Sequence, residues 1–207
     1  MSKLHVGTFF TENTPYEDIV KEYLIPSCKE LGIEPIVIAI PNQGSWMKNA
    51  AEKPKAIEVA LINYVKNGDV LLFLDADSIL ERNPTELLDI PPEYTLGYHT
   101  LDWNSWYGYH HQPAMMELLT GTMIFRHTSN IRTLCQEWHE MAKTTPIWEQ
   151  KVLQSLVPKY RHVKVYDLPI EYCYMDSLPD GREPLVKCDN VVVRHFQKSR
   201  EYRGVMK

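Results

Sequence analysis

Two aspartates follow a run of apolar residues in the segment VLLFLDADSIL, residues 70–80. The five residues before the first aspartate are all apolar, as expected for a central strand that is covered on both faces. Asp75 and Asp77 would then lie at the carboxyl end of that strand, where open α/β sheets bind their ligands, and alternate strand residues share one face. Two carboxylates this close repel each other unless a cation is near, and all-oxygen ligands favour Mg²⁺, Ca²⁺ or Mn²⁺. The segment therefore predicts a site for a hard divalent cation.

A simpler interpretation of the same residues needs no metal. Asp77 or Ser78 could cap the turn that follows, and Asp75 could be a solvated strand end. Against this interpretation stands the cost in free energy of placing two carboxylates beyond a buried strand without a counter-charge. We therefore prefer the metal site.

The elements that must position this site alternate along the chain between strand-like and helix-like segments. Such alternation is typical of a sheet built from βα units and predicts an α/β fold. Helices are expected near Pro15 and over residues 54–66 and 129–143. Strands are expected at residues 4–10, 35–40, 70–74, 95–99, 122–126, 163–168 and 190–196.

Length and composition limit the classes of function. A chain of 207 residues suits one compact domain, and we expect this domain to cover residues 1–207. The formal net charge of −5 argues against nucleic acid as the main partner, because phosphate binding needs a basic face. No apolar run approaches the roughly 20 residues of a membrane span. The four cysteines are scattered, without a C-x-x-C pair or a signal peptide, so we expect reduced thiols and a cytoplasmic protein.

Two segments do not follow the strand and helix pattern. The segment DWNSWYGYHHQP, residues 102–113, is expected to be a loop. Its aromatic rings could pack on a sugar or could form an interface with a partner protein. The segment SLPDGREP, residues 177–184, is expected to be a polar turn.

The segment FLDADSIL resembles the D-x-D motif of nucleotide-sugar glycosyltransferases of the GT-A fold, especially the glycogenin-like family. Five further segments resemble that family in the same order along the chain. They are TFFTENTPYEDIVKEYLIPSC, KPKAIEVALINY, LTGTMIFRHTSN, WEQKVLQSL and NVVVRHF. The resemblance implies a single Rossmann-like GT-A catalytic domain, with a mixed sheet flanked by helices. It also implies metal-dependent transfer of a hexosyl group from a nucleotide-sugar donor, with a UDP-sugar favoured.

The resemblance also assigns roles around the donor. Tyr16 matches a tyrosine that contacts the uracil, and Thr8 would line the same nucleobase pocket. Lys55 matches the lysine of the helix before the D-x-D strand. Lys198 would approach the diphosphate. Here the chain departs from the family pattern, because Lys198 and Glu201 stand where the family has a glycine and a phosphate-binding lysine.

Phosphate contact in this altered segment could come from Lys198, Arg200 or Arg203, since arginine can bind phosphate through two bonds. The alternative is a solvated basic tail.

The implied cofactor is Mn²⁺, or Mg²⁺, held by Asp75, Asp77 and His195, with Asp75 also reaching the ribose. Carboxylate and phosphate oxygens with one imidazole nitrogen suit octahedral coordination, and the histidine favours manganese. The alternative for His195 is a histidine that ends a core strand with a backbone hydrogen bond.

The acceptor side of the implied site contains Gly121 and Glu149. Gly121 would let a sugar approach closely because it has no side chain, although it could equally serve a turn at the start of a strand. Glu149 replaces the family's aspartate and could hold the acceptor or assist at the anomeric centre. It could also be an ordinary first-turn glutamate that interacts with the helix dipole.

Two other functions fit the same residues. A D-x-D motif after an apolar strand also resembles phosphatases of the haloacid dehalogenase superfamily, although that family places the motif on its first strand. A GT-A-like domain could instead bind a nucleotide or glycan without turnover. The donor sugar and the acceptor, whether a glycan, a protein or a small molecule, stay unassigned.

Overall fold

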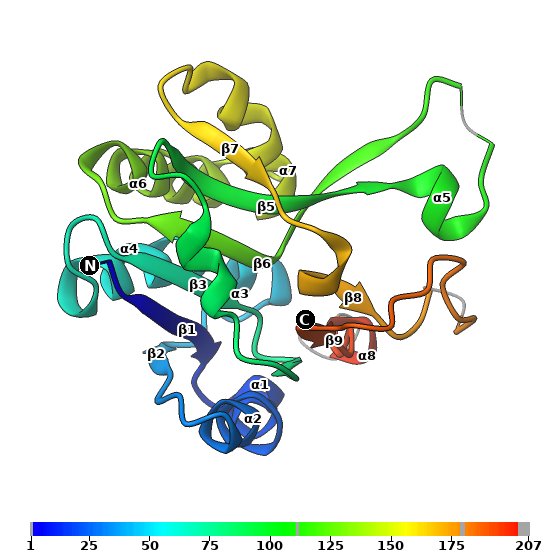
Figure 1. Cartoon of the computed structure of the whole chain (residues 1–207), viewed down its shortest axis with the longest axis horizontal. Helices are drawn as coiled ribbons and strands as arrows, with labels where there is room; N and C mark the ends of the chain where they lie inside the picture. Colours follow the sequence, from blue (N-terminus) through cyan, green and yellow to red (C-terminus); the bar gives the residue numbers. More distant parts are fainter. Residues whose placement is uncertain (1, 111, 179–180, 203–207) are drawn as a thin grey trace.

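A six-stranded sheet forms the centre of the computed structural model, which describes residues 2–110, 112–178 and 181–202. The strand order is β2–β1–β3–β6–β5–β7 (Figure 1). The pairs β1–β2, β1–β3 and β5–β7 are parallel, whereas β3–β6 and β5–β6 are antiparallel, so the sheet is mixed as predicted. The strands are β1 (Leu4–Thr11), β2 (Ile36–Ile40), β3 (Val70–Leu74), β5 (Tyr94–Asp102), β6 (Met116–Arg126) and β7 (Lys164–Asp167).

Strand β3 is central and every one of its residues is buried, as its continuous apolar run predicts. Its alternate residues enter two different cores, with Leu71 and Phe73 on one face and Leu72 and Leu74 on the other. Because β6 runs antiparallel to it, Leu74 pairs with Thr122, and the residues that precede Thr122 lie beside the end of β3.

Helices cover both faces of the sheet (Figure 1). Helices α4 (Lys53–Tyr64), α6 (Ser129–Thr144) and α7 (Glu149–Leu156) share a core with Leu71 and Phe73. Helices α1 (Pro15–Glu22) and α2 (Leu24–Glu30) pack on the other face. The shorter helices are α3 (Trp46–Ala50), α5 (Trp103–Tyr107), α8 (Ser199–Tyr202) and the 3₁₀ turns η1 (Thr85–Asp89), η2 (Val157–Lys159) and η3 (Ile170–Tyr172). Among the described residues, no helix is both long enough and apolar enough to span a membrane.

A second, three-stranded sheet lies at the carboxyl end of β3. Its order is β4–β9–β8, formed by β4 (Ser78–Leu80), β9 (Val193–His195) and β8 (Tyr174–Met175). The strand predicted at residues 190–196 is therefore shorter and lies outside the main sheet, because its partners are only two or three residues long. Ser78 pairs with His195, which brings the histidine to the segment that follows the two aspartates.

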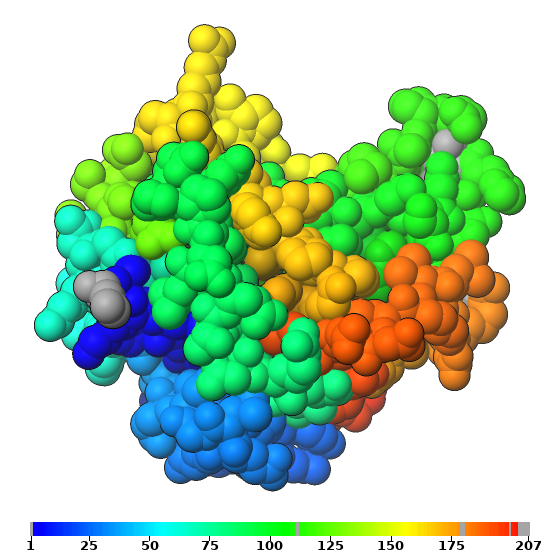
Figure 2. Space-filling view, viewed as in Figure 1, coloured from blue at the N-terminus to red at the C-terminus, as the bar shows by residue number. Residues whose placement is uncertain are grey.

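The long ends of β5 and β6 carry α5 away from the sheet as a projecting arm (Figures 1 and 2). The expectation of a loop over residues 102–113 is wrong in part, because residues 103–107 form α5. The Asp102 side chain caps this helix by accepting a hydrogen bond from the Asn104 N–H, and Gly108 ends it at a φ of 70°. In the predicted polar turn, the Leu178 N–H donates to the Arg182 carbonyl.

Candidate active site

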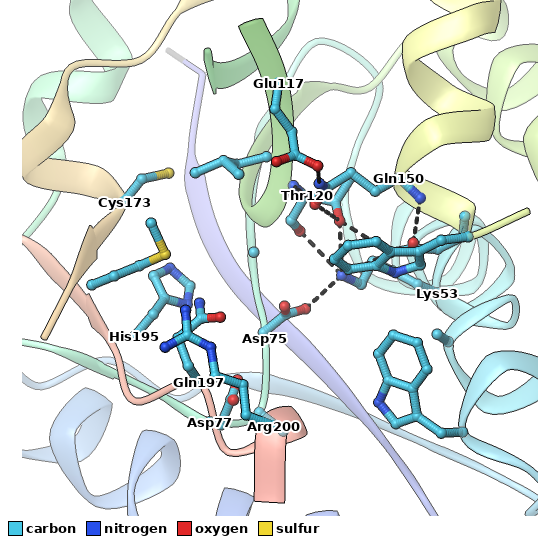
Figure 3. A pocket seen from close by; sticks show the side chains of 18 of the residues that line it. Lys53, Asp75, Asp77, Glu117, Thr120, Gln150, Cys173, His195, Gln197 and Arg200 are labelled. Carbon is cyan, nitrogen blue, oxygen red and sulfur yellow. Dashed lines mark hydrogen bonds and ion pairs between the residues drawn. The ribbon is translucent and has the colours of Figure 1, made fainter. Parts of the chain in front are cut away.

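A cavity of about 550 Å³ opens beyond the carboxyl ends of β1 and β3 (Figure 3). Its position is the one expected for a ligand site in an open α/β sheet. Most of the site residues predicted from the sequence line it, namely Tyr16, Asp75, Asp77, Gly121, Glu149 and His195. Within the described part of the chain, the lining does not include Thr8, Lys55 or Lys198.

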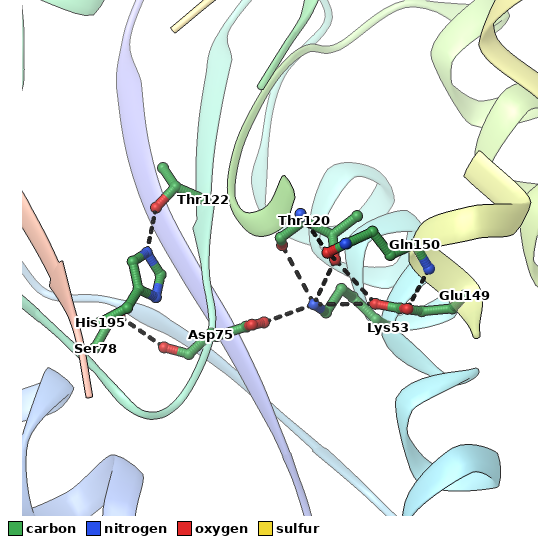
Figure 4. Close-up of polar contacts among 8 residues, drawn as sticks. All are labelled: Lys53, Asp75, Ser78, Thr120, Thr122, Glu149, Gln150 and His195. Atoms are coloured by element: carbon green, nitrogen blue, oxygen red, sulfur yellow. Dashed lines mark hydrogen bonds and ion pairs between the residues drawn. The ribbon is translucent and has the colours of Figure 1, made fainter. Parts of the chain in front are cut away.

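Lys53 occupies the place that the sequence assigned to Lys55. Its Nζ lies 2.7 Å from Asp75 Oδ1 and 3.2 Å from Glu149 Oε1, and it donates to both the carbonyl and the hydroxyl of Thr120 (Figure 4). Burial alone would lower the pKa of Lys53, but the two carboxylates outweigh it and raise that pKa. A buried ammonium therefore bridges Asp75 and Glu149.

Lys55 lies outside the cavity. Residues two positions apart in a helix lie about 200° apart around its axis, so Lys53 and Lys55 point to nearly opposite sides of α4. The Lys55 side chain is 45% exposed and its Nζ pairs with Glu58 Oε2 at 2.7 Å. The structure therefore corrects the predicted lysine by two residues.

Glu149 is the first residue of α7 and is almost completely buried. It accepts a hydrogen bond of 3.0 Å from the Thr120 hydroxyl and another from the Gln150 N–H. Burial raises the pKa of Glu149, and the nearby Lys53 ammonium opposes this only in part. Its carboxylate is thus fixed by partners on α4, β6 and α7.

The sequence analysis did not predict three residues of this network, namely Lys53, Thr120 and Gln150. The Gln150 side chain accepts from the Thr120 N–H at 3.2 Å and donates to Glu117 at 2.9 Å. The sequence feature that could have indicated Gln150 is its position in the WEQKVLQSL segment, directly after Glu149. For Thr120, the neighbouring Gly121 was the nearest indication.

Asp75 and His195 meet over Gly121, which has no side chain to separate them. A Cβ atom on Gly121 would lie 3.0 Å from His195 Cε1, 3.3 Å from His195 Nδ1 and 3.5 Å from Asp75 Oδ2. His195 Nε2 is hydrogen-bonded to the Thr122 hydroxyl at 2.8 Å, so Nδ1 is the ring nitrogen on the Gly121 side (Figure 4). Burial lowers the pKa of His195 to about 4, and the neutral imidazole that results is the form that binds metals.

Asp77 is held differently from Asp75, contrary to the expectation that both extend from one strand face. Strand β3 ends at Leu74, and Ala76 and Asp77 already form a turn. Asp77 is only 6% exposed and accepts a hydrogen bond from the Lys198 N–H. Burial, followed by repulsion from Asp75, raises the pKa of Asp77 to about 6.

These donors fit a hard divalent cation by type, since they are two carboxylates and one neutral imidazole. Lys53 compensates Asp75 and Glu149 only in part, and Asp77 has no cationic side chain in contact with it among the described residues. In the ranges that the structure describes, no three His, Cys, Asp or Glu side chains already surround one point. The set therefore consists of Asp75 and His195 facing each other, with Asp77 beside them.

The remaining predicted donor contacts are placed as follows. Tyr16 lines the cavity, with its ring edge-on to Tyr202 at 6.3 Å. Thr8 is fully buried inside β1, and the cavity is lined instead by the last three residues of that strand, Phe9, Phe10 and Thr11. Lys198 pairs its ammonium with Glu201 at 2.9 Å, so only its main chain approaches the site.

Arg200 lines the cavity in place of Lys198 and donates to the Ser177 carbonyl at 2.8 Å. Arg203 lies outside the described residues.

Residues 45–197 match the protein family described as nucleotide-diphospho-sugar transferases. The chain belongs to this family. Membership confirms the predicted relationship to nucleotide-sugar glycosyltransferases and removes the support for the phosphatase alternative. No curated protein sequence matches the chain.

Solved glycosyltransferase structures share the fold of this transferase. A glycosyltransferase involved in the glycosylation of the major capsid of PBCV-1 aligns with a TM-score of 0.65 and 15% identity, over 99% of this chain and 98% of its own. The galactosyltransferase LgtC, in complex with donor and acceptor sugar analogues, aligns with a TM-score of 0.54 and 15% identity, over 93% and 87%. Mouse xyloside xylosyltransferase 1 aligns with a TM-score of 0.51 and 10% identity, over 96% and 99%. The predicted GT-A fold is confirmed.

Proposed function

We propose that the protein is a glycosyltransferase that depends on a divalent cation and moves a hexosyl group from a UDP-sugar to an acceptor. The observation that carries this proposal is the approach of Asp75 and His195 across Gly121, in the cavity that also holds the Lys53–Glu149 pair. These five residues come from five separate parts of the chain. Family membership supplies the donor class, and the choice of UDP rests on the place of Tyr16 in the cavity.

Asp75, Asp77 and His195 are the residues that would hold Mn²⁺, or Mg²⁺, in this site. When bound, such an ion acts as a Lewis acid that neutralises the diphosphate of the leaving nucleotide. Lys53 occupies Asp75 Oδ1, so Oδ2 is the oxygen on the side of His195. The Arg200 guanidinium, which lines the same cavity, is suited to bind a phosphate oxygen in place of Lys198.

Glu149 is the proposed catalytic carboxylate. Because Lys53 and Thr120 hold it in one position, it can orient an acceptor hydroxyl or stabilise positive charge at the anomeric carbon without reorganising. Its burial strengthens both interactions, since electrostatic energies rise as water is excluded. Gly121 leaves space for the sugar beside this group.

Calorimetric titration with UDP and GDP, each with and without Mn²⁺, tests the donor site. We expect Mn²⁺-dependent binding of UDP that is lost in Asp77→Ala and kept in Asp89→Ala, an exposed aspartate outside the cavity. Binding of UDP that does not depend on Mn²⁺, or that is kept in Asp77→Ala, would overturn the assignment of the donor site.

Release of UDP from UDP-glucose and UDP-galactose then separates an enzyme from a binding protein. Slow hydrolysis that requires Mn²⁺ and falls in Glu149→Gln supports transfer chemistry. Tight binding of the UDP-sugar without any turnover indicates a domain that binds the nucleotide without catalysis.

A further inference from the structure

Three aromatic rings on the projecting arm form one side of the cavity, and we call Trp103, Tyr107 and Tyr109 the aromatic wall. All three line the cavity. Their ring centroids are 5.4 Å apart for Trp103 and Tyr107, 6.0 Å for Trp103 and Tyr109, and 5.5 Å for Tyr107 and Tyr109. These separations are those of rings in contact, so the wall is one continuous apolar surface.

Helix α5 separates its aromatic residues into two roles. Trp106 is 2% exposed and packs its ring 6.3 Å from that of Tyr174, in a small core that anchors the arm. Trp103 and Tyr107 are one helical turn apart, which places them on the same side of the helix. Of the aromatic rings in residues 102–113, Trp106 is therefore not one that packs on a sugar or a partner, because it is buried and holds the arm in place.

The wall is tied to the reacting groups through one buried carboxylate. Glu117, which is 7% exposed, accepts a hydrogen bond of 2.8 Å from the Trp103 indole N–H. Its other oxygen accepts from Gln150 at 2.9 Å and lies 2.8 Å from the Lys151 ammonium. Both of these partners are in the first turn of α7, next to Glu149. Movement of the wall relative to Glu149 would break these contacts.

The wall is joined through Trp103 to Glu117, which lies apart from the groups proposed to hold the leaving nucleotide. Figure 3 shows Glu117 and Gln150 on one side of Asp75, and Asp77 and Arg200 on the other. A nucleoside diphosphate held by Asp77 and Arg200 would therefore leave the Glu117 side to the second substrate.

We propose that the aromatic wall is the acceptor subsite and that the acceptor is a glycan, bound by stacking of one pyranose ring. This inference rests on the proposed function. A pyranose has an apolar face of C–H groups with slightly positive hydrogens, which complements the negative face of an aromatic ring. Its hydroxyl groups point outward from the ring edge, where polar groups such as Glu117, Gln150 and Lys151 line the cavity.

Saturation-transfer NMR on the full chain with UDP and Mg²⁺ tests the wall, because Mg²⁺ is diamagnetic and does not broaden the glycoside signals. The probes are methyl β-D-glucopyranoside, methyl β-D-galactopyranoside and methyl α-D-mannopyranoside, because stacking tolerates differences between hexoses. We expect saturation of one ring face of at least one glycoside, reduced about fivefold or more in the Tyr107→Ala, Tyr109→Ala double variant. The single variant Tyr107→Phe, which keeps the ring and leaves Tyr109 unchanged, should give the same signal as the natural chain.

Tyr64→Ala is the matched control, since Tyr64 is 56% exposed on α4 and lies outside the cavity lining. The signal in this variant should equal that of the natural chain. No saturation of any probe, or equal saturation in the double variant, would overturn the acceptor wall. A loss of UDP affinity as large as the loss of glycoside signal would also overturn it, because the rings would then belong to the donor site.

Titration of the natural chain with UDP separates failure of this inference from failure of the proposed function. Mn²⁺-dependent binding of UDP without binding of glycosides overturns the wall and leaves the donor site intact. Wall-dependent binding of glycosides without binding of UDP overturns the transferase and the acceptor role, and leaves a sugar-binding surface.

Discussion

The two polar clusters that share the cavity differ in how their charges are balanced. Around Lys53, each group has protein partners, since the ammonium contacts Asp75, Glu149 and Thr120. Around Asp77, a buried carboxylate lies next to a second carboxylate and a neutral histidine, without a cationic side chain in contact among the described residues. The first cluster has an ammonium between its two carboxylates, whereas the second would gain stability from an added cation.

The two clusters use their charges differently, although both lie in the same cavity. The Lys53 cluster orients Glu149 and one oxygen of Asp75 before any substrate arrives, which is the preorganisation that catalysis requires. The Asp77 cluster carries a cost in the folded state that ligand binding would remove. Substitutions in the two clusters should therefore change stability in opposite directions.

The largest effect is expected from Lys53→Met, which removes the charge and keeps most of the side-chain volume. Asp75 and Glu149 would lose their buried counter-charge, and the free energy of unfolding should fall by about 3–5 kcal/mol. Urea unfolding measures this change. Lys55→Met, on the exposed side of the same helix, should change it by less than about 0.5 kcal/mol. Equal stability of the two variants would show that the Lys53 pairs are not ionised.

The opposite sign is expected from Asp77→Asn without metal. The folded-state pKa of about 6 lies above the ordinary value of 3.8, so the folded protein holds this proton more tightly than the unfolded chain. Stability therefore falls as pH rises from about 4 to about 6 and remains reduced above that range. At pH 8 the asparagine should add up to about 3 kcal/mol.

Thermal unfolding in EDTA at pH 5 and pH 8 checks this prediction. The gain from Asp77→Asn should be about half as large at pH 5 as at pH 8, because the unfolded carboxyl is already ionised at pH 5, and Asp89→Asn should give little change at either pH. If Asp77→Asn is less stable than the natural chain at pH 8, the Asp77 carboxylate is stabilised by the protein and the prediction is wrong.

A smaller loss is expected from Thr120→Val, which keeps the shape of the side chain and removes its hydroxyl. The hydrogen bond to Glu149 and one from Lys53 would disappear, which should cost about 1–2 kcal/mol. Thr133→Val, on the exposed part of α6, is the control for loss of a hydroxyl. Comparison of the two variants by urea unfolding measures how much the buried network adds to the free energy of unfolding.

The smallest effect on stability is expected from Gly121→Ala, which should cost less than about 1 kcal/mol because the His195 ring can shift by a few tenths of an ångström. Its effect should appear instead in the second cluster. The methyl group would lie between Asp75 and His195, so Mn²⁺-dependent affinity for UDP should fall about tenfold. Calorimetry of nucleotide binding measures this change. An unchanged affinity would show that the missing side chain at Gly121 is not needed for nucleotide binding.

The continuous apolar run was sufficient to predict the central strand, because such a run depends on local pattern alone. The resemblance singled out Asp75, Asp77 and His195, which all line the cavity, and their role as metal ligands stays a prediction. The resemblance misplaced the lysine because Lys53 and Lys55 flank one proline, and only the orientation of α4 decides which of them faces the cavity. The partners of Glu149 escaped prediction for a similar reason. Thr120 reaches that residue through strand pairing and the packing of α7, and neither is encoded near position 120.

The pairing of Ser78 with His195 has a consequence for the order of folding. This contact joins segments that are separated by more than about a hundred residues of chain, and contacts between such distant segments form late because the intervening loop must first be closed. The main sheet can assemble before β9 arrives. During refolding, the tryptophan fluorescence of the core should therefore recover before nucleotide binding does, so a folded scaffold would precede a competent site.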